Sequence, residues 1–301
     1  MNEHALQAVV VGAGTMGTTL AKLMAVQGVK VIMVDTNPDV LETSRLSIGK
    51  DVANVCFTTE LKVAQSPDFV IECVTENTAI KQNVVAQIES SMPDTTIIMT
   101  NTSGIPIDDI GRTMRIPQRF LGAHFFNPAD IIPTVEVIPG SQTDASVVET
   151  ACRWLKQLGK RPAVINIGVP GFVANRIQHA MMRECLSLLE KGVLEAEALD
   201  DIVQYSIGVR MALNGPLRQR DLNGLDTHLN IARYLYPDLD ARDKPAALLE
   251  DYVAQGRLGA KTGQGFYSWS EESRAQHQTQ EREDLQNIIK IAMQHVSRED
   301  L

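Results

Sequence analysis

Residues 6–17 of the chain read LQAVVVGAGTMG, an apolar run rich in β-branched residues that ends in a cluster of glycines. Residues 16–26 have the spacing of a helix, and a second apolar run, residues 29–34, ends at Asp35. A strand, a glycine turn, a helix and a second strand within about 30 residues make up the unit from which parallel α/β sheets are built. This stretch therefore predicts an α/β fold with a mostly parallel sheet.

The glycine cluster is a GxGxxG motif between the expected strand and the expected helix. Gly12 permits the tight turn, Gly14 lets the backbone approach a pyrophosphate, and Gly17 lets the helix pack on the strand. Thr15 and Met16 lie in the same loop, where the first N–H groups of the helix favour an anion. The motif alone is a weak signal, but its position here predicts a dinucleotide site.

Asp35 indicates which dinucleotide binds. It ends the second strand 18 residues after Gly17, close to the roughly 20 residues expected for the acid that binds the ribose hydroxyls. A carboxylate repels the 2′-phosphate of NADP, and the neighbouring Thr36 and Asn37 supply no cation. NAD is therefore the predicted cofactor, since nothing else in the sequence indicates a flavin domain.

Apolar strands and amphipathic helices alternate to about residue 167, which is typical of a sheet covered on both faces. We expect strands at 55–57, 69–74, 96–100, 119–126, 134–138 and 162–167, and helices at 38–48, 79–91 and 145–158. Beyond residue 171 the pattern is helical, with helices expected at 172–191, 195–206, 224–235 and 244–255 and an apolar helical stripe in the tail. The predicted domains are a Rossmann-type NAD-binding domain, 1–169, and a helical substrate and dimerisation domain, 170–301.

The composition of the 301 residues excludes several classes of protein. Asp and Glu number 37 against 28 Lys and Arg, a net charge of -9, which argues against nucleic acid or an anionic membrane as a partner. No apolar run approaches the roughly 18 residues of a spanning helix, and the first residues lack the pattern of a signal peptide. The four cysteines have no metal-ligand spacing. We expect a cytoplasmic protein without a metal site that acts on a small molecule.

His124 follows an apolar strand, and Glu136 lies inside the apolar run 134–138. A carboxylate among β-branched residues is costly to bury unless it is paired. The loop between the two expected strands is short enough to place the two side chains side by side. A histidine supported by a carboxylate is the usual base that removes a proton from an alcohol, with the carboxylate fixing its tautomer. The pair therefore predicts oxidation of a hydroxyl group.

Several segments, taken in order, resemble the L-3-hydroxyacyl-CoA dehydrogenase family over nearly the whole chain. They are the Gly12–Gly17 loop, Glu76-Asn77 with Lys81, Asn101-Thr102-Ser103, HFFNP at 124–128, VEVI at 135–138, PGFVANR at 170–176, Gly224-Leu225-Asp226 and KTGQGFY at 261–267. The resemblance implies reversible hydride transfer between NAD and a secondary alcohol.

The resemblance also implies roles for single residues. His124 matches the family's catalytic base, and Glu136 matches its acidic partner. Ser103 and Asn175 match residues that hold or polarise the reacting oxygen. The residues that match those lining NAD are Glu76, Lys81, Asn127 and Lys261. As alternatives, the Asn-Pro pair at 127 can form a turn and the asparagine at 175 can cap a helix. By analogy with the family we expect a homodimer.

One interval departs from the family. Members that act on acyl-CoA usually carry a long helical hairpin between the second strand and the strand leading to Glu76, and this hairpin contacts coenzyme A. Here the interval is only the 33 residues 36–68, whose cations Arg45, Lys50 and Lys62 are scattered, whereas a phosphate site needs convergent positive charge. We therefore expect a small free hydroxy-carboxylate as substrate, although another surface could bind CoA.

Residues 102–107 and 131–133 look more like a branch of the family that oxidises small non-CoA compounds. The alternative substrate is then an aromatic or pyridine carboxylate that carries a hydroxymethyl or formyl group. Arg210, Arg218 and Arg220 could bind its carboxylate bidentately, or could be solvated surface charges.

Two readings from outside the family remain. A β-hydroxyacid dehydrogenase is disfavoured because Gly171 stands where such enzymes have a lysine, four residues before Asn175. The other is a non-catalytic nucleotide-binding or crystallin-like structural protein, against which the intact set of His124, Glu136 and Ser103 argues.

Overall fold

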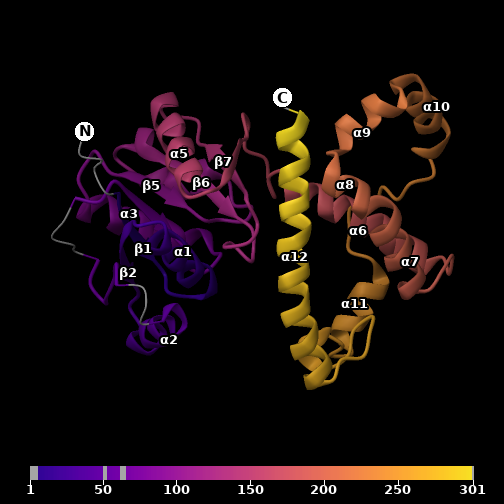
Figure 1. The fold of residues 1–301 in the computed structure, drawn as a ribbon, viewed down its shortest axis with the longest axis horizontal. Coiled ribbons are helices and arrows are strands. Elements are labelled where there is room, and N and C mark those ends of the chain that lie inside the picture. Colours follow the sequence, from indigo (N-terminus) through magenta and orange to yellow (C-terminus); the bar gives the residue numbers. More distant parts are fainter. Residues whose placement is uncertain (1–5, 50–52, 62–65, 300–301) are drawn as a thin grey trace. The chain divides into compact units, whose positions relative to one another are not determined.

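The computed structural model describes residues 6–49, 53–61 and 66–299, which form two compact units (Figure 1). The first unit ends at Arg176 and the second begins at Ile177. This division falls later than the boundary expected at 169/170, because hydrogen bonds hold residues 171–175 to the first unit. No helix in the described ranges is long and apolar enough to cross a membrane.

The first unit is built on one eight-stranded sheet, in the order β3-β2-β1-β4-β5-β6-β7-β8. Neighbouring strands are parallel except β6 and β7. The strands are β1 Gln7–Val11, β2 Lys30–Val34, β3 Val55–Thr58, β4 Phe69–Glu72, β5 Ile97–Thr100, β6 Phe120–Phe125, β7 Thr134–Pro139 and β8 Arg161–Val164. The predicted mostly parallel sheet is confirmed. The strand order reverses between β1 and β4, which is the point where ligands of such sheets bind.

Both faces of the sheet are buried, and successive residues of β1 alternate between them. Ala8 and Val10 belong to one core cluster, and Val9 and Val11 to the other. The helices of the first cluster are α1 Thr15–Val26, α2 Pro38–Ile48 and α5 Ala145–Gln157, and those of the second are α3 Thr78–Ser91 and α4 Ile107–Ile110. Two short turns of 3-10 helix, η1 Gly111–Thr113 and η2 Pro117–Arg119, lead into β6. This double covering explains why the strands read as continuous apolar runs.

The second unit is helical, as predicted. Its elements are α6 Ala174–Glu190, which begins in the first unit, then α7 Ala196–Ile202, the π-helical segment η3 Val203–Gly208, α8 Val209–Leu213, α9 Pro216–Asn223, α10 Leu225–Leu235, α11 Ala247–Ala254, η4 Ala260–Thr262 and α12 Glu271–Glu299. Helix α9 was not expected, because its residues are mostly polar and show no apolar periodicity. Helix α12 extends well beyond the apolar stripe that predicted it.

Candidate functional site

The glycine loop joins β1 to α1 at the carboxyl end of the sheet. Gly12 has a φ of 103°, and a Cβ there would lie 2.8 Å from the carbonyl carbon of Cys73. A Cβ on Gly17 would lie 1.8 Å from the carbonyl oxygen of Gly12, whereas one on Gly14 would meet nothing within 4 Å. Packing therefore requires the two outer glycines, and the middle one leaves the loop open for a ligand.

The start of α1 is suited to an anion. Thr15 and Met16 form its first turn, and among the described residues no side chain caps the helix at Gly14. The first N–H groups of a helix have no partner within the helix, and the helix dipole adds partial positive charge there. This terminus can therefore hold the pyrophosphate of a dinucleotide.

A cavity of about 510 Å³ lies beside the loop, with Asp35 in its wall. Asp35 Oδ2 accepts a hydrogen bond from Ala13 N at 2.8 Å, and Asp35 Oδ1 accepts one from Asn37 N at 2.9 Å. The carboxylate is thus fixed while each oxygen keeps a lone pair for a ribose hydroxyl. The lining residues are Val11, Gly12, Gly14, Val34, Asp35, Thr36, Val40, Thr59, Leu61, Cys73, Val74, Thr75, Ile80, Val84 and Gln87. None of these described residues is a lysine or arginine, so the wall fits the adenosine of NAD and offers no cation to a 2′-phosphate.

His124 and Glu136 lie directly opposite each other in the antiparallel pair β6–β7. Glu136 Oε2 is 2.8 Å from His124 Nδ1, and both side chains are buried. Because a carboxylate only accepts, Nδ1 carries a proton, and in the neutral imidazole Nε2 then has the lone pair. The other oxygen, Oε1, accepts hydrogen bonds from the backbone N–H groups of Val173 (3.1 Å) and Ala174 (2.9 Å). The pair expected from the sequence is therefore formed, with Nε2 free to act as a base.

Ser103 follows β5, at the same edge of the sheet. Its backbone N–H donates to Glu76 Oε1 at 2.8 Å, and its carbonyl oxygen accepts from Asn175 Nδ2 at 2.8 Å. Thr102 Oγ1 also donates to Glu76 Oε1, at 2.6 Å. Ser103 is exposed, so the structure joins Glu76, Ser103 and Asn175 into one network and leaves the serine side chain accessible to a ligand.

Lys81, which the family resemblance places among the residues that line NAD, is completely buried, and its contact with NAD stays a prediction. Its Nζ donates to both oxygens of Glu72 (2.9 and 3.1 Å) and lies 3.4 Å from Glu76 Oε2. Glu72 is also fully buried and accepts from Thr100 Oγ1 at 2.6 Å. Lys81 therefore stabilises the carboxylate of Glu76 through this ion pair. Glu72 was missed in the sequence, although it lies inside the apolar run 69–74, and a carboxylate inside an apolar run is the signal that identified Glu136.

The loop between β6 and β7 is held by a buried lysine, Lys160, which was not identified from the sequence. Lys160 Nζ donates to the carbonyl oxygens of Ala129 and Ile132, the latter at 3.0 Å. Burial lowers the pKa of Lys160 below that of an exposed lysine. Asn127, which is exposed and precedes a cis peptide bond, lies at the start of this loop.

Lys261 lies on η4 in the second unit and is exposed. Its expected contact with NAD stays a prediction. Arg210 and Arg220 are likewise exposed residues of the second unit, and Arg210 Nε donates to the carbonyl oxygen of Ser206.

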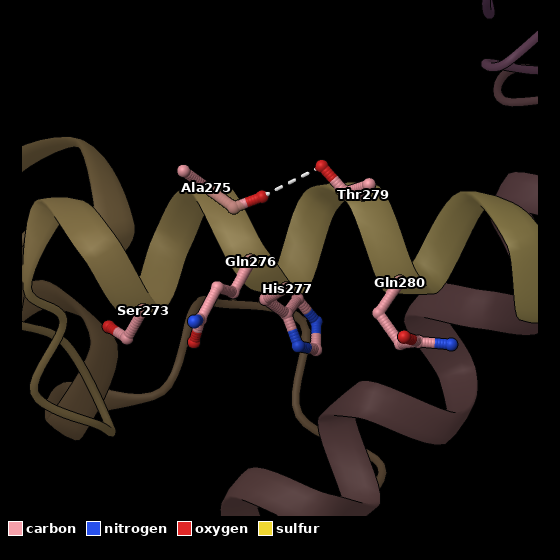
Figure 2. Close-up of a pocket in the computed structure, with 6 residues that line it drawn as sticks. All are labelled: Ser273, Ala275, Gln276, His277, Thr279 and Gln280. Carbon is pink, nitrogen blue, oxygen red and sulfur yellow. Dashed lines mark hydrogen bonds between the residues drawn. The ribbon is translucent and has the colours of Figure 1, made fainter.

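A second hollow runs along α12 (Figure 2). Ser273, Gln276, His277 and Gln280 point to one side of the helix, while the Thr279 hydroxyl donates to Ala275 O at 3.1 Å on the other. All of its lining residues come from this one helix. They include no glycine turn and no buried pair of titratable groups, so we assign no chemistry to it.

The glycine loop, the Asp35 cavity and the buried histidine–carboxylate pair share the carboxyl edge of one sheet, and together they define an NAD-dependent dehydrogenase that acts on a hydroxyl group. Residues 7–167 match the family model described as 3-hydroxyacyl-CoA dehydrogenase, NAD binding domain. Residues 171–269 match the C-terminal domain of the same family. The chain belongs to the 3-hydroxyacyl-CoA dehydrogenase family.

Two kinds of relative are similar to the chain. The 5-formyl-3-hydroxy-2-methylpyridine 4-carboxylate 5-dehydrogenase of Mesorhizobium japonicum is 34% identical over 298 residues, covering 94% of this chain and 96% of its own. A crystal structure of an enzyme of that name, described as an NAD+ dependent dismutase, has a TM-score of 0.90 at 32% identity and covers 96% of this chain and 99% of its own. The crystal structure of the (S)-3-hydroxybutyryl-CoA dehydrogenase of Ralstonia eutropha has a TM-score of 0.72, also at 32% identity. The match covers 89% of this chain and 100% of that protein's chain.

Replacement of Glu136 by Gln should abolish most turnover. An amide cannot accept from His124 Nδ1 with one end and from two backbone N–H groups with the other, so one set of bonds is lost and the imidazole loses its orientation. We expect kcat to fall by about two to four orders of magnitude, with the NADH dissociation constant, measured by fluorescence titration, unchanged. Glu149→Gln on the exposed face of α5 is the matched control. A kcat within twofold of wild type would contradict the role of Glu136.

Replacement of Lys81 by Met should destabilise the first unit by about 3–5 kcal/mol, because it leaves Glu72 buried without its cation. Urea denaturation measures this effect, with exposed Lys22→Met as the control. The double variant Glu72→Met/Lys81→Met should regain much of the stability but should bind NADH more weakly, since Glu76 has lost its support. Unchanged stability of the single variant would contradict the ion pair.

Proposed function

We propose that the chain oxidises and reduces a small free carboxylate with NAD(H), and that this substrate is an aromatic or pyridine carboxylate with a formyl or hydroxymethyl group. The observation that supports this proposal most directly is the interval between β2 and β4. Its described residues form only α2 and β3 and contain no helical hairpin. The surface that usually receives coenzyme A is therefore absent from the described part of this interval.

The cations of this interval do not form a described phosphate site. Arg45 pairs with Glu42 at 3.5 Å and lies over the ring of Phe57 at 5.1 Å. Lys50 and Lys62 fall outside the described residues. A polyphosphate such as coenzyme A is usually held by several cations that converge on it, and Arg45 already has partners on its own surface.

Structural similarity favours the same substrate class. The pyridine-carboxylate dehydrogenase and the hydroxybutyryl-CoA dehydrogenase are equally similar to this chain in sequence, at 32% identity. Their TM-scores differ, at 0.90 against 0.72. The backbone therefore resembles that of the enzyme with the small substrate more closely than sequence identity alone would indicate.

The site supplies an acid–base mechanism. His124 Nε2 removes the proton from the substrate hydroxyl while the carbon that bears it loses a hydride, and Glu136 stabilises the imidazolium that forms. Ser103 and Asn175 hold the reacting oxygen. Bound NAD+ supplies the acceptor for the hydride. In the reverse direction the imidazolium returns the proton to the carbonyl oxygen as NADH is consumed.

A formyl group can react in both directions at this site. Its hydrate, a geminal diol, loses a proton and a hydride to give the carboxylic acid, and the free aldehyde gains both to give the alcohol. Dismutation is the general term for such a pair of reactions, and the related enzyme of known crystal structure is described as an NAD+ dependent dismutase. The proposed substrate class therefore includes compounds for which one molecule is oxidised and another reduced.

We propose that the protein is cytoplasmic and forms a homodimer. Among the described residues of the second unit, the buried apolar side chains are only Leu186, Leu199 and Ala246. Large apolar side chains are exposed along its helices, including Leu225 and Leu229 of α10. Apolar surface on this scale marks an interface, and a second copy would cover it. The four cysteines are free, which fits a reducing compartment.

A substrate comparison tests the proposed function. Acetoacetyl-CoA, free acetoacetate and aromatic or pyridine carboxylates with an adjacent formyl or hydroxymethyl group would be assayed with NAD(H). We expect the aromatic formyl carboxylates to exceed acetoacetyl-CoA in kcat/KM by about 100-fold or more, because a site shaped for one polar group rejects compounds that lack it. His124→Ala should lose turnover and keep NADH binding. A preference for acetoacetyl-CoA would assign the chain to the acyl-CoA branch.

Sedimentation equilibrium tests the dimer. The wild-type protein should have twice the mass of the 33.1 kDa chain. Leu229→Glu, which places a charge on the exposed apolar face of α10, should shift the equilibrium toward monomer. Leu46→Glu, at an exposed position of α2 in the first unit, should leave the mass unchanged. A monomeric wild-type protein would contradict the proposal.

A further inference from the structure

Phe172 has an unusual backbone conformation. Among the described residues it is the one non-glycine residue with a positive φ, 49°, and it follows Gly171, whose φ is 74°. A residue with a Cβ is disfavoured in this region because the Cβ approaches the neighbouring carbonyl oxygen. Strain of this kind persists only where surrounding structure enforces it, often at functional sites. The contacts of Phe172 show what enforces it here.

The turn at Phe172 delivers two hydrogen-bond donors to Glu136. Phe172 N donates to Val169 O at 2.9 Å, which closes the turn. The next two backbone N–H groups, of Val173 and Ala174, then reach Glu136 Oε1 at 3.1 and 2.9 Å. With Oε2 bound to His124 Nδ1, both oxygens of the carboxylate are held. The direction of the chain at Phe172 therefore sets the plane of Glu136, and through it the plane of the imidazole.

The ring of Phe172 contacts the base itself. It is fully buried in the core cluster that includes Ile138. Its centroid lies 5.8 Å from that of the His124 imidazole, with 54° between the planes, and Phe126 lies 4.6 Å from the same imidazole. Two aromatic rings and one hydrogen bond thus limit the tilt of the imidazole. Removal of one ring would leave room for the imidazole to turn.

We propose that Phe172 is a positioning residue for the general base: its backbone conformation presents two N–H groups to Glu136, and its ring holds the imidazole in the orientation that leaves Nε2 toward the substrate. The proposal rests on the assignment of His124 as the base under the proposed function. It requires no contact of Phe172 with substrate or cofactor.

Three substitutions test the role of the ring. Phe172→Gly removes the ring but adopts the positive φ freely, Phe172→Ala removes the ring and keeps the strain, and Phe172→Leu keeps bulk without a flat ring. Val26→Ala is the control, because this side chain is exposed at the end of α1. We expect kcat to fall about 10- to 100-fold in the Gly and Ala variants and about three- to tenfold in the Leu variant. The KM for NAD should stay within twofold of wild type.

A measurement without turnover makes the test independent of the substrate. The proton on His124 Nδ1, observed by NMR in ¹⁵N-labelled protein and assigned with Glu136→Gln, should exchange slowly in wild type and in Val26→Ala. It should exchange faster or shift in Phe172→Gly and Phe172→Ala. If these two variants do not fold, Phe172→Leu decides by the same signal.

The outcomes separate this inference from the proposed function. A wild-type Nδ1–H signal in Phe172→Gly or Phe172→Ala, or in Phe172→Leu if those two do not fold, would overturn the positioning role, whatever the kcat. A perturbed signal together with a loss of kcat at constant KM for NAD supports it. If no carboxylate or CoA substrate in the comparison turned over, the proposed function would fail while the Nδ1–H signal still decided the role of Phe172.

Discussion

Glu136 places a carboxylate inside the protein, and the catalytic half of the site is arranged around the three donors that stabilise it. One donor is the imidazole of His124, and the others are the backbone N–H groups of Val173 and Ala174. A buried carboxylate that lost such partners would cost several kcal/mol. Glu136 therefore joins β6, β7 and the turn before α6, so that His124, the proposed base, is oriented only when all three segments are in place.

A similar constraint acts on the cofactor half of the site. Glu72 ends β4 as a fully buried carboxylate, and Lys81 and Thr100 satisfy it from α3 and β5. The same lysine lies 3.4 Å from Glu76, which holds the backbone of Ser103. The loop that presents Ser103 is thus fixed before any ligand binds. Preorganised polar groups of this kind lower the reorganisation that a reaction would otherwise require.

The sequence was sufficient where a function depends on local pattern. The GxGxxG motif, the spacing to Asp35 and the alternation of elements predicted the sheet and the NAD site because each is encoded within about 30 residues. The pairing of His124 with Glu136 was also predictable, since adjacent strands with a short connection leave few alternatives. Tertiary packing determines the features of the site that the sequence did not predict. Glu72 lies only nine residues before Lys81, but no local pattern indicates that the lysine is buried, because its burial follows from the packing of α3 on the sheet. Other differences have the same origin. The turn at Phe172, with its positive φ, presents backbone N–H donors to Glu136. No local propensity encodes this conformation.

The antiparallel pairing of β6 and β7 has a consequence for how enzymes of this kind can diverge. His124 and Glu136 face each other across one ladder, and a shift of one residue in either strand would turn one of the side chains to the opposite face of the sheet. Insertions within these strands are therefore excluded, and the connection between them is itself held by Lys160 through Ala129 and Ile132. The proposed proton-transfer pair can therefore stay constant while segments outside this ladder, such as the interval between β2 and β4, differ between proteins that act on different substrates.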